Sequence, residues 1–302
     1  MKLTYRASYW LTHLCVLLWG FTAILGKLIT LSPLPLVMWR MLFSALVLGI
    51  LVYSKKIPKL SLKDSIILMA LGILLSLHWI SFYASVKTAN ASVAVVCITL
   101  SSVFVAMLSP IILKERFRLS HFLLGLIMLI GIWVIFGTLK VEYRIGLYYG
   151  VIAALLVSVF SCYNKIMASK FHPYAIVFWE MIGGFLFLFI VFIINTLLYK
   201  NISYTLDFNQ WHYFFIFVVF CTVLPLVIST AALQQLSAFV SIFLVNLEPI
   251  YGILLAALFL HENQQLSHRF YWGALIILSG IFLQIWWERS LKNRFYKNQI
   301  PE

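Results

Sequence analysis

Two carboxylates stand inside long apolar stretches of this sequence. Of nine acidic residues, only Glu180 and Glu248 have runs of hydrophobic side chains on both sides. A charged side chain at the centre of a bilayer costs at least about 2.5–3.5 kcal/mol on insertion scales, so such residues are candidates for binding substrates or ions. Both carboxylates are therefore candidate functional residues.

Glu248 is the centre of the preferred site. Pro249 follows it and lacks the N–H that would bond one turn back, so a backbone carbonyl is freed nearby. Asn246 adds a donor and an acceptor two residues earlier. We expect Glu248 either to bind substrate or to carry a coupling proton. The alternative is a structural carboxyl that bonds neighbouring helices.

Arg40 and Glu180 are opposite charges within apolar stretches. Arg40 follows Pro35 by five residues, which places it about 8 Å from one face at 1.5 Å per residue, and Glu180 is similarly deep from the other face. The two could pair during one stage of a cycle or form separate gates, and Arg40 could instead reach the headgroups. Lys27 and Lys165 are the other charged residues within the apolar stretches. Both are near the ends of their stretches, so we expect their side chains to extend to the membrane interface.

A histidine and several aromatic residues accompany these charges. His78 has an unperturbed pKa of about 6.5, which suits a proton relay, although a lone histidine on an apolar helix is more often a hydrogen-bonded packing residue. Trp79, Tyr83, Trp19 and Tyr251 could stack on a substrate. Aromatic residues make up 17% of the chain, so most of them must pack or lie at the membrane interface.

The elements that must position these residues are membrane helices. The chain has 302 residues, 63% hydrophobic and 10% charged, with a mean hydropathy of +1.01. This composition excludes a soluble enzyme, a secreted disulfide scaffold and a disordered chain. About 20 apolar residues cross a bilayer as a helix. The sequence predicts ten such helices, at 9–29, 35–53, 65–85, 91–113, 121–138, 146–167, 174–198, 211–232, 237–260 and 270–287.

The basic residues predict the orientation of the chain. They lie in short segments between the apolar runs, which indicates membrane topology rather than nucleic-acid binding. With the N-terminus inside, 15 Lys and Arg residues fall on the cytoplasmic side and 5 on the other. The positive-inside rule therefore predicts that both termini are cytoplasmic.

No motif in the sequence indicates enzyme chemistry. It has no HExxH, no glycine-rich phosphate loop and no nucleophile elbow. The cysteines lie in four separate apolar runs without metal-ligand spacing: Cys15, Cys97, Cys162 and Cys221. We expect no catalytic residue, no metal and no cofactor. Any transport would be driven by a gradient or by the substrate's own concentration rather than by a nucleotide.

The two halves of the chain resemble one another. With a constant offset of 147, the segment 83–121 overlays 230–268, so Ser101 and Ser102 take the positions of Glu248 and Pro249. The predicted repeats are 1–140 and 141–302, with five helices each. An odd number of spans inverts the second repeat, as in many secondary transporters, and brings Ser101, Ser102, Asn246 and Glu248 to a similar depth.

Short motifs in both halves resemble the EamA type of the drug/metabolite transporter superfamily. They are Leu18-Trp19-Gly20-Phe21, Arg40, Tyr83-Ala84-Ser85, Ala91-Ser92-Val93-Ala94, Ser102-Val103-Phe104-Val105-Ala106, Glu115-Arg116-Phe117, Gly125, Asn246-Leu247-Glu248-Pro249-Ile250 and Leu260-His261-Glu262. One departure is Ser102, where the family often has proline. We therefore expect any helix break at this repeat position only in the second half. The resemblance implies peripheral fifth and tenth spans.

The resulting expectation is an all-α secondary transporter in the cell (inner) membrane that works by alternating access. By resemblance, its substrates are small organic metabolites with amino acids as the leading class, and its direction is export. A multidrug or toxic-compound efflux pump is the alternative within transport, and a membrane enzyme or scaffold is the alternative from another class. The expected partners are a small-molecule substrate, the lipid bilayer and a proton as a candidate coupling ion, without nucleic acid. Both a monomer and a homodimer are compatible with the sequence.

Overall fold

The protein is helical throughout the part of the chain that can be described. The computed structural model describes residues 3–114, 119–137, 141–199, 205–236, 244–245, 247–264 and 266–297. Within them, seven helical stretches are long and apolar enough to cross a membrane, and a shorter apolar helix covers Glu248–Leu260. The chain is thus a multi-pass membrane protein. The number of ten spans and the cytoplasmic location of both termini stay predictions.

Three long helices begin the chain, α1 (Tyr5–Leu28), α2 (Pro33–Ser54) and α3 (Leu62–Thr88). Their starts follow from local sequence. The hydroxyl of Thr4 accepts a hydrogen bond from the N–H of Ala7 at 3.2 Å, and that of Ser61 accepts one from Asp64 at 3.1 Å. Pro33 occupies the first position of α2, where a missing N–H costs no intrahelical bond.

The next membrane-crossing stretch is broken into α4 (Ala91–Ile98) and α5 (Ser101–Ile112). The N–H groups of Thr99 and Leu100 bond to carbonyls three residues back, at 3.1 and 3.0 Å, as in a 3₁₀ turn. The Thr99 hydroxyl also donates to the carbonyl of Val96 at 2.6 Å. The expectation that only the second half would be broken here was wrong. The tightened turn satisfies its own polar groups, so the break needs no proline.

The remaining helices are α6 (Leu119–Phe136), α7 (Arg144–Ala168), α8 (Pro173–Tyr199), α9 (Trp211–Val218), α10 (Leu224–Ala232), α12 (Glu248–Leu260) and α13 (His268–Lys297). A π-helical turn, Val219–Val223, joins α9 to α10. Helix α12 starts at Glu248 and α5 starts at Ser101, which is the same position of the repeat. In the first half this start lies within Ala91–Ile112, a stretch long enough to cross a membrane.

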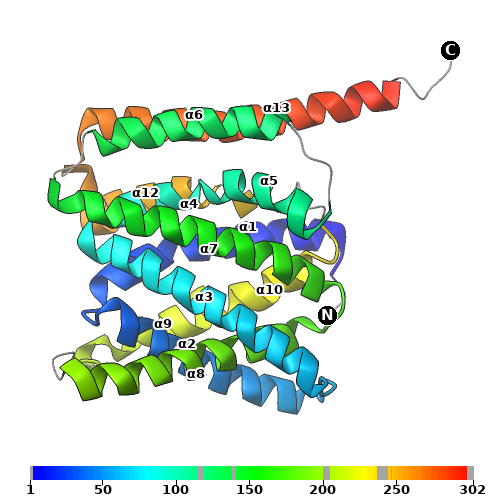
Figure 1. Cartoon of the computed structure of the whole chain (residues 1–302), viewed down its shortest axis with the longest axis vertical. Helices are drawn as coiled ribbons and strands as arrows, with labels where there is room; N and C mark the ends of the chain where they lie inside the picture. The colour runs from blue at the N-terminus through cyan, green and yellow to red at the C-terminus, as the bar shows by residue number, and fades with distance from the viewer. Residues whose placement is uncertain are drawn as a thin grey trace.

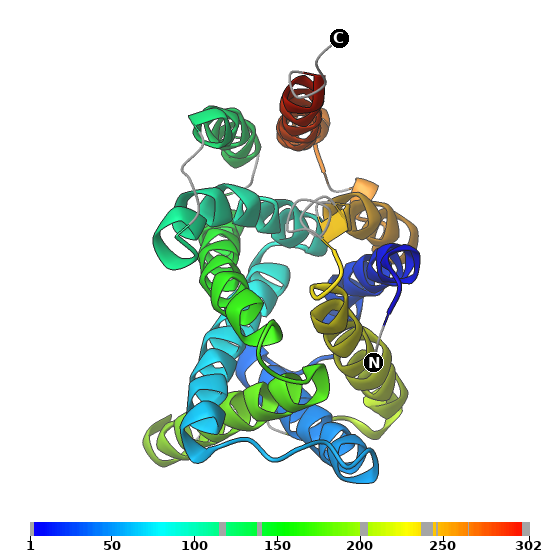
Figure 2. The same ribbon diagram turned by 90° about the vertical axis from the view of Figure 1, so that its right-hand side faces the viewer.

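The helices run side by side in one bundle, with α6 and α13 together along one edge (Figure 1). An end-on view places this pair outside the ring of the other helices (Figure 2). The pair is held close by Gly131 and Gly273, because a Cβ on either would lie 2.8 Å from the carbonyl oxygen of the other. Helix α1 begins and α13 ends on the same side of the bundle (Figure 1).

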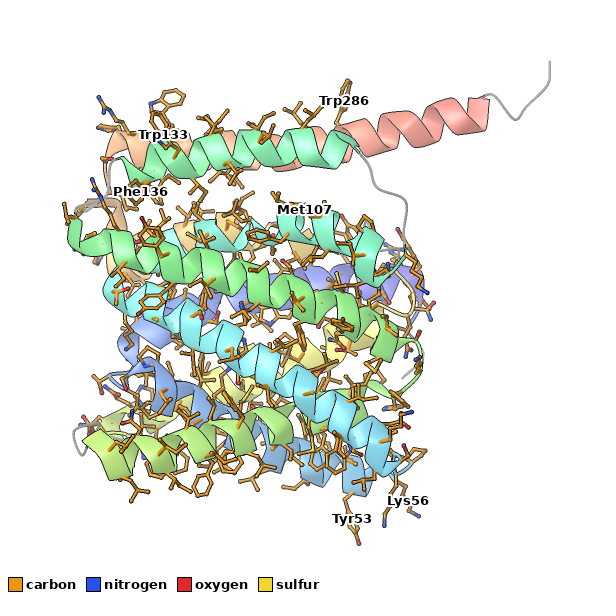
Figure 3. All side chains as sticks on the ribbon, viewed as in Figure 1. Tyr53, Lys56, Met107, Trp133, Phe136 and Trp286 are labelled. Carbon is orange, nitrogen blue, oxygen red and sulfur yellow. The ribbon has the colours of Figure 1, made fainter. Side chains whose placement is uncertain are left out.

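Large apolar side chains cover the outside of the bundle. Trp133, Trp286 and Tyr53 are 75%, 63% and 87% exposed and point away from the helices (Figure 3). A soluble monomer rarely exposes contiguous apolar surface on this scale, whereas a lipid environment requires it. This surface agrees with a bundle embedded in a bilayer.

The crossing of α3 and α8 is a backbone contact. A Cβ built on Gly72 would lie 1.9 Å from the carbonyl oxygen of Glu180, and one built on Gly183 would lie 2.2 Å from that of Met69. Only glycine allows the two helices to approach so closely. The crossing joins a helix of the first half to a helix of the second and places Glu180 at their contact.

Candidate functional site

Arg40 is the centre of a buried polar cluster between the two halves. Its side chain is 2% exposed. The guanidinium donates from Nε to the hydroxyl of Thr222 at 2.7 Å, from Nη1 to the phenol oxygen of Tyr83 at 2.7 Å, and from Nη2 to the carbonyl of Cys221 at 3.4 Å. One alternative was that the Arg40 side chain extends to the outer headgroups. In this conformation that alternative is wrong, because the side chain turns into the bundle.

The π-helical turn and the proline after it supply two of these three acceptors. Pro225 has no N–H, so the carbonyl of Cys221 lacks its usual partner four residues on and is free to accept from Arg40. Within the turn, the Thr222 hydroxyl donates to the carbonyl of Phe217, five residues back, at 2.7 Å. Its lone pairs then face Arg40. Single π-turns inside α-helices are frequent at functional sites.

Aromatic rings enclose the same guanidinium. The Arg40 Cζ atom lies 3.7 Å from the ring centre of Trp79, 4.4 Å from that of Phe217 and 5.8 Å from that of Tyr83. A cation over a desolvated aromatic face gains about 2 kcal/mol or more. The position of Tyr83 depends on Gly26, since a Cβ there would lie 2.4 Å from the tyrosine ring.

Glu248, the preferred residue of the sequence analysis, begins α12. It is half-buried at the first position of α12, and it is close enough to interact electrostatically with the Tyr83 phenol. A helix N-terminus favours a negative charge. Arg40 from α2 thus bonds to Tyr83, and the charge of Glu248 at the start of α12 influences the same phenol. Asn246, the predicted neighbour of Glu248, lies outside the described residues.

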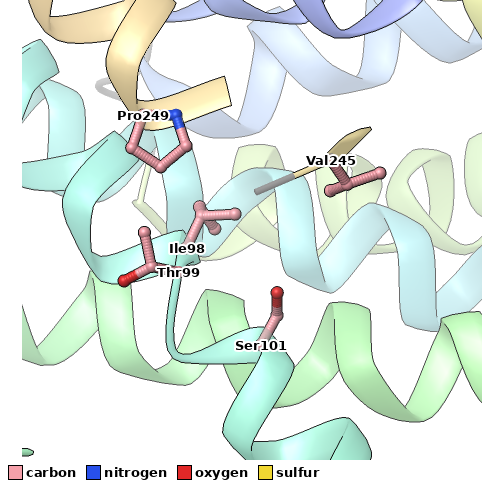
Figure 4. A pocket seen from close by; sticks show the side chains of 5 residues that line it. All are labelled: Ile98, Thr99, Ser101, Val245 and Pro249. Atoms are coloured by element: carbon pink, nitrogen blue, oxygen red, sulfur yellow. The ribbon is translucent and has the colours of Figure 1, made fainter. Parts of the chain in front are cut away.

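A small hollow separates the starts of α5 and α12. It has no room for a water molecule and is lined by Ile98, Thr99, Ser101, Val245 and Pro249 (Figure 4). Ser101 points its hydroxyl to the hollow, and its carbonyl accepts a bond from Ser158 at 3.0 Å. Ser102, one residue later, is buried. Ser101 thus lies near Pro249 at the start of α12, and the shared depth of Ser101, Ser102, Asn246 and Glu248 stays a prediction.

Glu180 has no part in the Arg40 cluster. Its side chain is 0% exposed, and among the described residues neither carboxylate oxygen has a hydrogen-bond partner. The Arg40 donors bond instead to Thr222, Tyr83 and Cys221. An Arg40–Glu180 pair is therefore not formed in this conformation. Pairing at another stage of a cycle and two separate gates both stay predictions.

The other candidates lie apart from the cluster or only border it. His78 donates from Nδ1 to the carbonyl of Ala153 in α7 at 2.8 Å, so one ring nitrogen has a packing role. Lys27 is exposed at the end of α1 and donates to the carbonyl of Val86 at 3.3 Å. Lys165 is half-buried near the end of α7.

Trp19 and Tyr251 pack together in a separate apolar cluster with Val16 and Leu244. The Tyr251 hydroxyl is 2.6 Å from Nε2 of His13, a histidine that the sequence analysis did not single out. These contacts are with the protein itself. They place neither aromatic ring against the Arg40 guanidinium.

Sequence reasoning missed Thr222, Cys221 and Phe217, which hold Arg40 from the second half. One signal was present, because Pro225 interrupts an apolar run and must free the carbonyl of Cys221. Among the described residues, no group of three or more His, Cys, Asp or Glu side chains could hold a metal ion.

Comparison with known proteins agrees with this architecture. The sequence model of the EamA-like transporter family matches residues 6–137 and again residues 144–286. No curated protein matches the sequence significantly. A solved structure, named only "Crystal structure of protein", superposes with a TM-score of 0.66 over 95% of this chain and 99% of its own, at 13% identity. At that identity the likeness shows the fold alone.

Proposed function

This chain belongs to the EamA-like transporter family of the drug/metabolite transporter superfamily, and on that premise we propose that it exports amino acids or related small metabolites. One observation carries the substrate class. A buried cation, Arg40, bonds to Tyr83 and is enclosed by Trp79 and Phe217. A carboxylate on another helix, Glu248, is near enough to influence the same phenol electrostatically. A zwitterion with a small side chain complements that arrangement.

The chemistry of each end of an amino acid supports this assignment. Arg40 makes one bond from each guanidinium nitrogen, which leaves one N–H on Nη1 and one on Nη2 for a carboxylate. Glu248 can accept from an ammonium group. Charge-assisted bonds are roughly twice as strong as neutral ones, so both ends contribute to selection. Arg40 and Glu248 serve here as substrate ligands.

The transport mechanism proposed is alternating access between two inverted repeats, 1–140 and 141–302. The family match in each half and the two helix starts at the same repeat position, at Ser101 and Glu248, support it. The proposal includes cytoplasmic termini, which the charge distribution favours, and a location in the plasma membrane. A proton is the proposed coupling ion.

An efflux pump for aromatic or cationic compounds is the second candidate. Trp79 and Phe217 face a cation already, at 3.7 and 4.4 Å from the Arg40 Cζ atom. The same rings would stack on a flat organic cation. A pump of this kind would transport such compounds and would not need an amino group on its substrate.

The experiment is transport by the full chain in proteoliposomes, screened with a panel of labelled amino acids. Glu248→Gln should weaken net transport and substrate exchange together, because a neutral amide replaces the partner of the ammonium group. Asp64→Asn, at the exposed start of α3, is the matched control and should transport normally.

Other outcomes assign Glu248 differently. If exchange persists while pH-driven accumulation disappears, Glu248 carries the proton rather than the ammonium group. If transport is normal at acidic, neutral and basic pH, Glu248 has neither role. If organic cations are moved and amino acids are not, the efflux alternative is correct.

A further inference from the structure

The protein buries two carboxylates in opposite ways. Glu262 is 3% exposed and fully bonded, with the N–H groups of Ala91 and Ser92 at 2.9 Å and the Ser92 hydroxyl at 2.7 Å. Glu180 is 0% exposed, and both its oxygens lack a partner among the described residues. Within the described part of the chain, the fold thus satisfies one buried carboxylate and gives the other no hydrogen-bond donor.

Contacts along α2 fix the depth of Glu180. A Cβ on Gly184 would lie 2.2 Å from the Sδ atom of Met41, and a Cβ on Gly49 would lie 3.3 Å from the ring of Phe178. Glu180 lies between Phe178 and Gly184, so it is level with the part of α2 between Met41 and Gly49. Arg40 is therefore one to two helical turns away along α2.

Few charged residues lie on the described helices that pack against α8, and none of them is hydrogen-bonded to the Glu180 carboxylate. Four helices pack against α8, and they are α2, α3, α7 and α10. Helix α10 has no ionisable residue. The charged and histidine residues on the other three are Arg40, Lys63, Asp64, His78, Lys87, Arg144 and Lys165. Arg40 bonds to its own cluster and His78 bonds to α7. Lys63 and Asp64 are eight or nine residues before Gly72 in α3, about 12 Å or more from the crossing.

Burial without a partner determines the charge of this side chain. An ionised carboxylate taken out of water costs several kcal/mol if nothing pairs with it. A neutral carboxylic acid loses only the hydration of a polar group. In this conformation Glu180 therefore holds a proton. Ser44, on the facing helix α2, also has a buried hydroxyl without a partner among the described residues.

We propose that Glu180 is the proton-binding site of the transport cycle, separate from the substrate ligands Arg40 and Glu248. This rests on the proposed function, because coupling needs a transported substrate. The proton leaves the carboxyl oxygen for water when the α3–α8 contact opens to one side, and a proton from the other side neutralises the carboxylate before the contact closes again. Arg40, one to two turns away, is the cation that can stabilise the ionised form in between.

The two carboxyl groups suit different tasks. Glu248 is half-buried at a helix N-terminus, where the helix dipole stabilises its negative charge. Glu180 lies inside α8, away from either end, with its backbone against Gly72 of α3 and its side chain 0% exposed. The first is suited to hold a cationic group of a substrate, and the second is suited to exchange a proton.

Infrared spectroscopy of the full chain in lipid tests the proton directly, with H⁺ as the only ligand. The wild type at neutral pH should show the carbonyl band of a protonated carboxylic acid. Glu180→Gln should remove that band, and Glu262→Gln, the matched control, should keep it. An unchanged band in Glu180→Gln would overturn the proposal.

A transport arm tests the coupling. Proteoliposomes with an imposed pH gradient and labelled amino acids should show accumulation by the wild type. Glu180→Gln should still exchange substrate while its accumulation ratio falls to unity. Continued accumulation by this variant would refute the proton site.

Two controls separate the possible failures. Glu180→Asp keeps a titratable group, so this variant should shift the infrared band and keep the coupling. It provides a test even if Glu180→Gln does not fold. A Glu180→Asp variant with an unshifted band contradicts the proposal. If the wild type moves no amino acid, the proposed substrate is wrong, and the infrared result still decides whether Glu180 binds a proton.

Discussion

Replacing Thr222 by valine should release Arg40 from the second half of the protein. Valine has nearly the shape of threonine but no hydroxyl. The change removes the acceptor of Arg40 Nε, 2.7 Å away, and the donor to the carbonyl of Phe217, also at 2.7 Å. Arg40 is 2% exposed, so water cannot replace the lost partner.

The size of the effect follows from these two bonds. A hydrogen bond to a charged group contributes about 1.5–3 kcal/mol, and a neutral one about 0.5–1.5 kcal/mol. The variant should therefore lose about 2–4 kcal/mol. Because about 1.4 kcal/mol is a factor of ten in an equilibrium, transport that depends on the position of Arg40 should fall by more than tenfold.

The assay combines thermal unfolding of the purified variant with transport in proteoliposomes. Thr222→Ser keeps the hydroxyl and should restore most of both properties. Thr230→Val is the matched control, since its hydroxyl bonds only to the carbonyl of Leu226 in the same helix, at 2.7 Å. If Thr222→Val and Thr230→Val lose equal stability and transport equally well, the bond to Arg40 has no role in holding the site.

Two further predictions concern the ends of the bundle. Glu262→Ala should lower the free energy of unfolding by about 1–3 kcal/mol, because the first two N–H groups of α4 lose their acceptor. Tryptophan fluorescence during unfolding measures this change, and an unchanged unfolding midpoint would contradict the prediction. A reporter enzyme that is active only outside the cell, fused after Glu302, should be inactive because both termini are predicted to be cytoplasmic; activity would reverse the topology or remove one span.

The sequence was sufficient for the family, the helical class and the charged residues inside the helices. These properties depend on the composition, on the length and spacing of the apolar stretches and on the order of short motifs, all of which can be read from one sequence. Arg40 was found as an intramembrane charge by this reasoning. Its partners were not, because Thr222 and Cys221 are about 180 residues away in the chain and meet Arg40 only through packing.

The break between α4 and α5 shows a second limit. The sequence offered a proline rule, and that rule predicted a break at Pro249 alone. The first half breaks without proline because Thr99 and Leu100 close a tight turn with their own N–H groups. Such a turn depends on small differences in backbone bonding that residue types alone do not display.

The glycines at the α3–α8 crossing stabilise the protein although glycine normally destabilises a helix. Inside an ordinary helix, alanine in place of glycine is better by about 0.5–1 kcal/mol because glycine is the more flexible residue in the unfolded chain. At Gly72 the added methyl would lie 1.9 Å from a backbone oxygen of the other half. The glycine positions that weaken each isolated helix are thus the positions at which the helices of the two repeats fit against one another. Substitutions chosen to strengthen the helices of this protein would separate its halves.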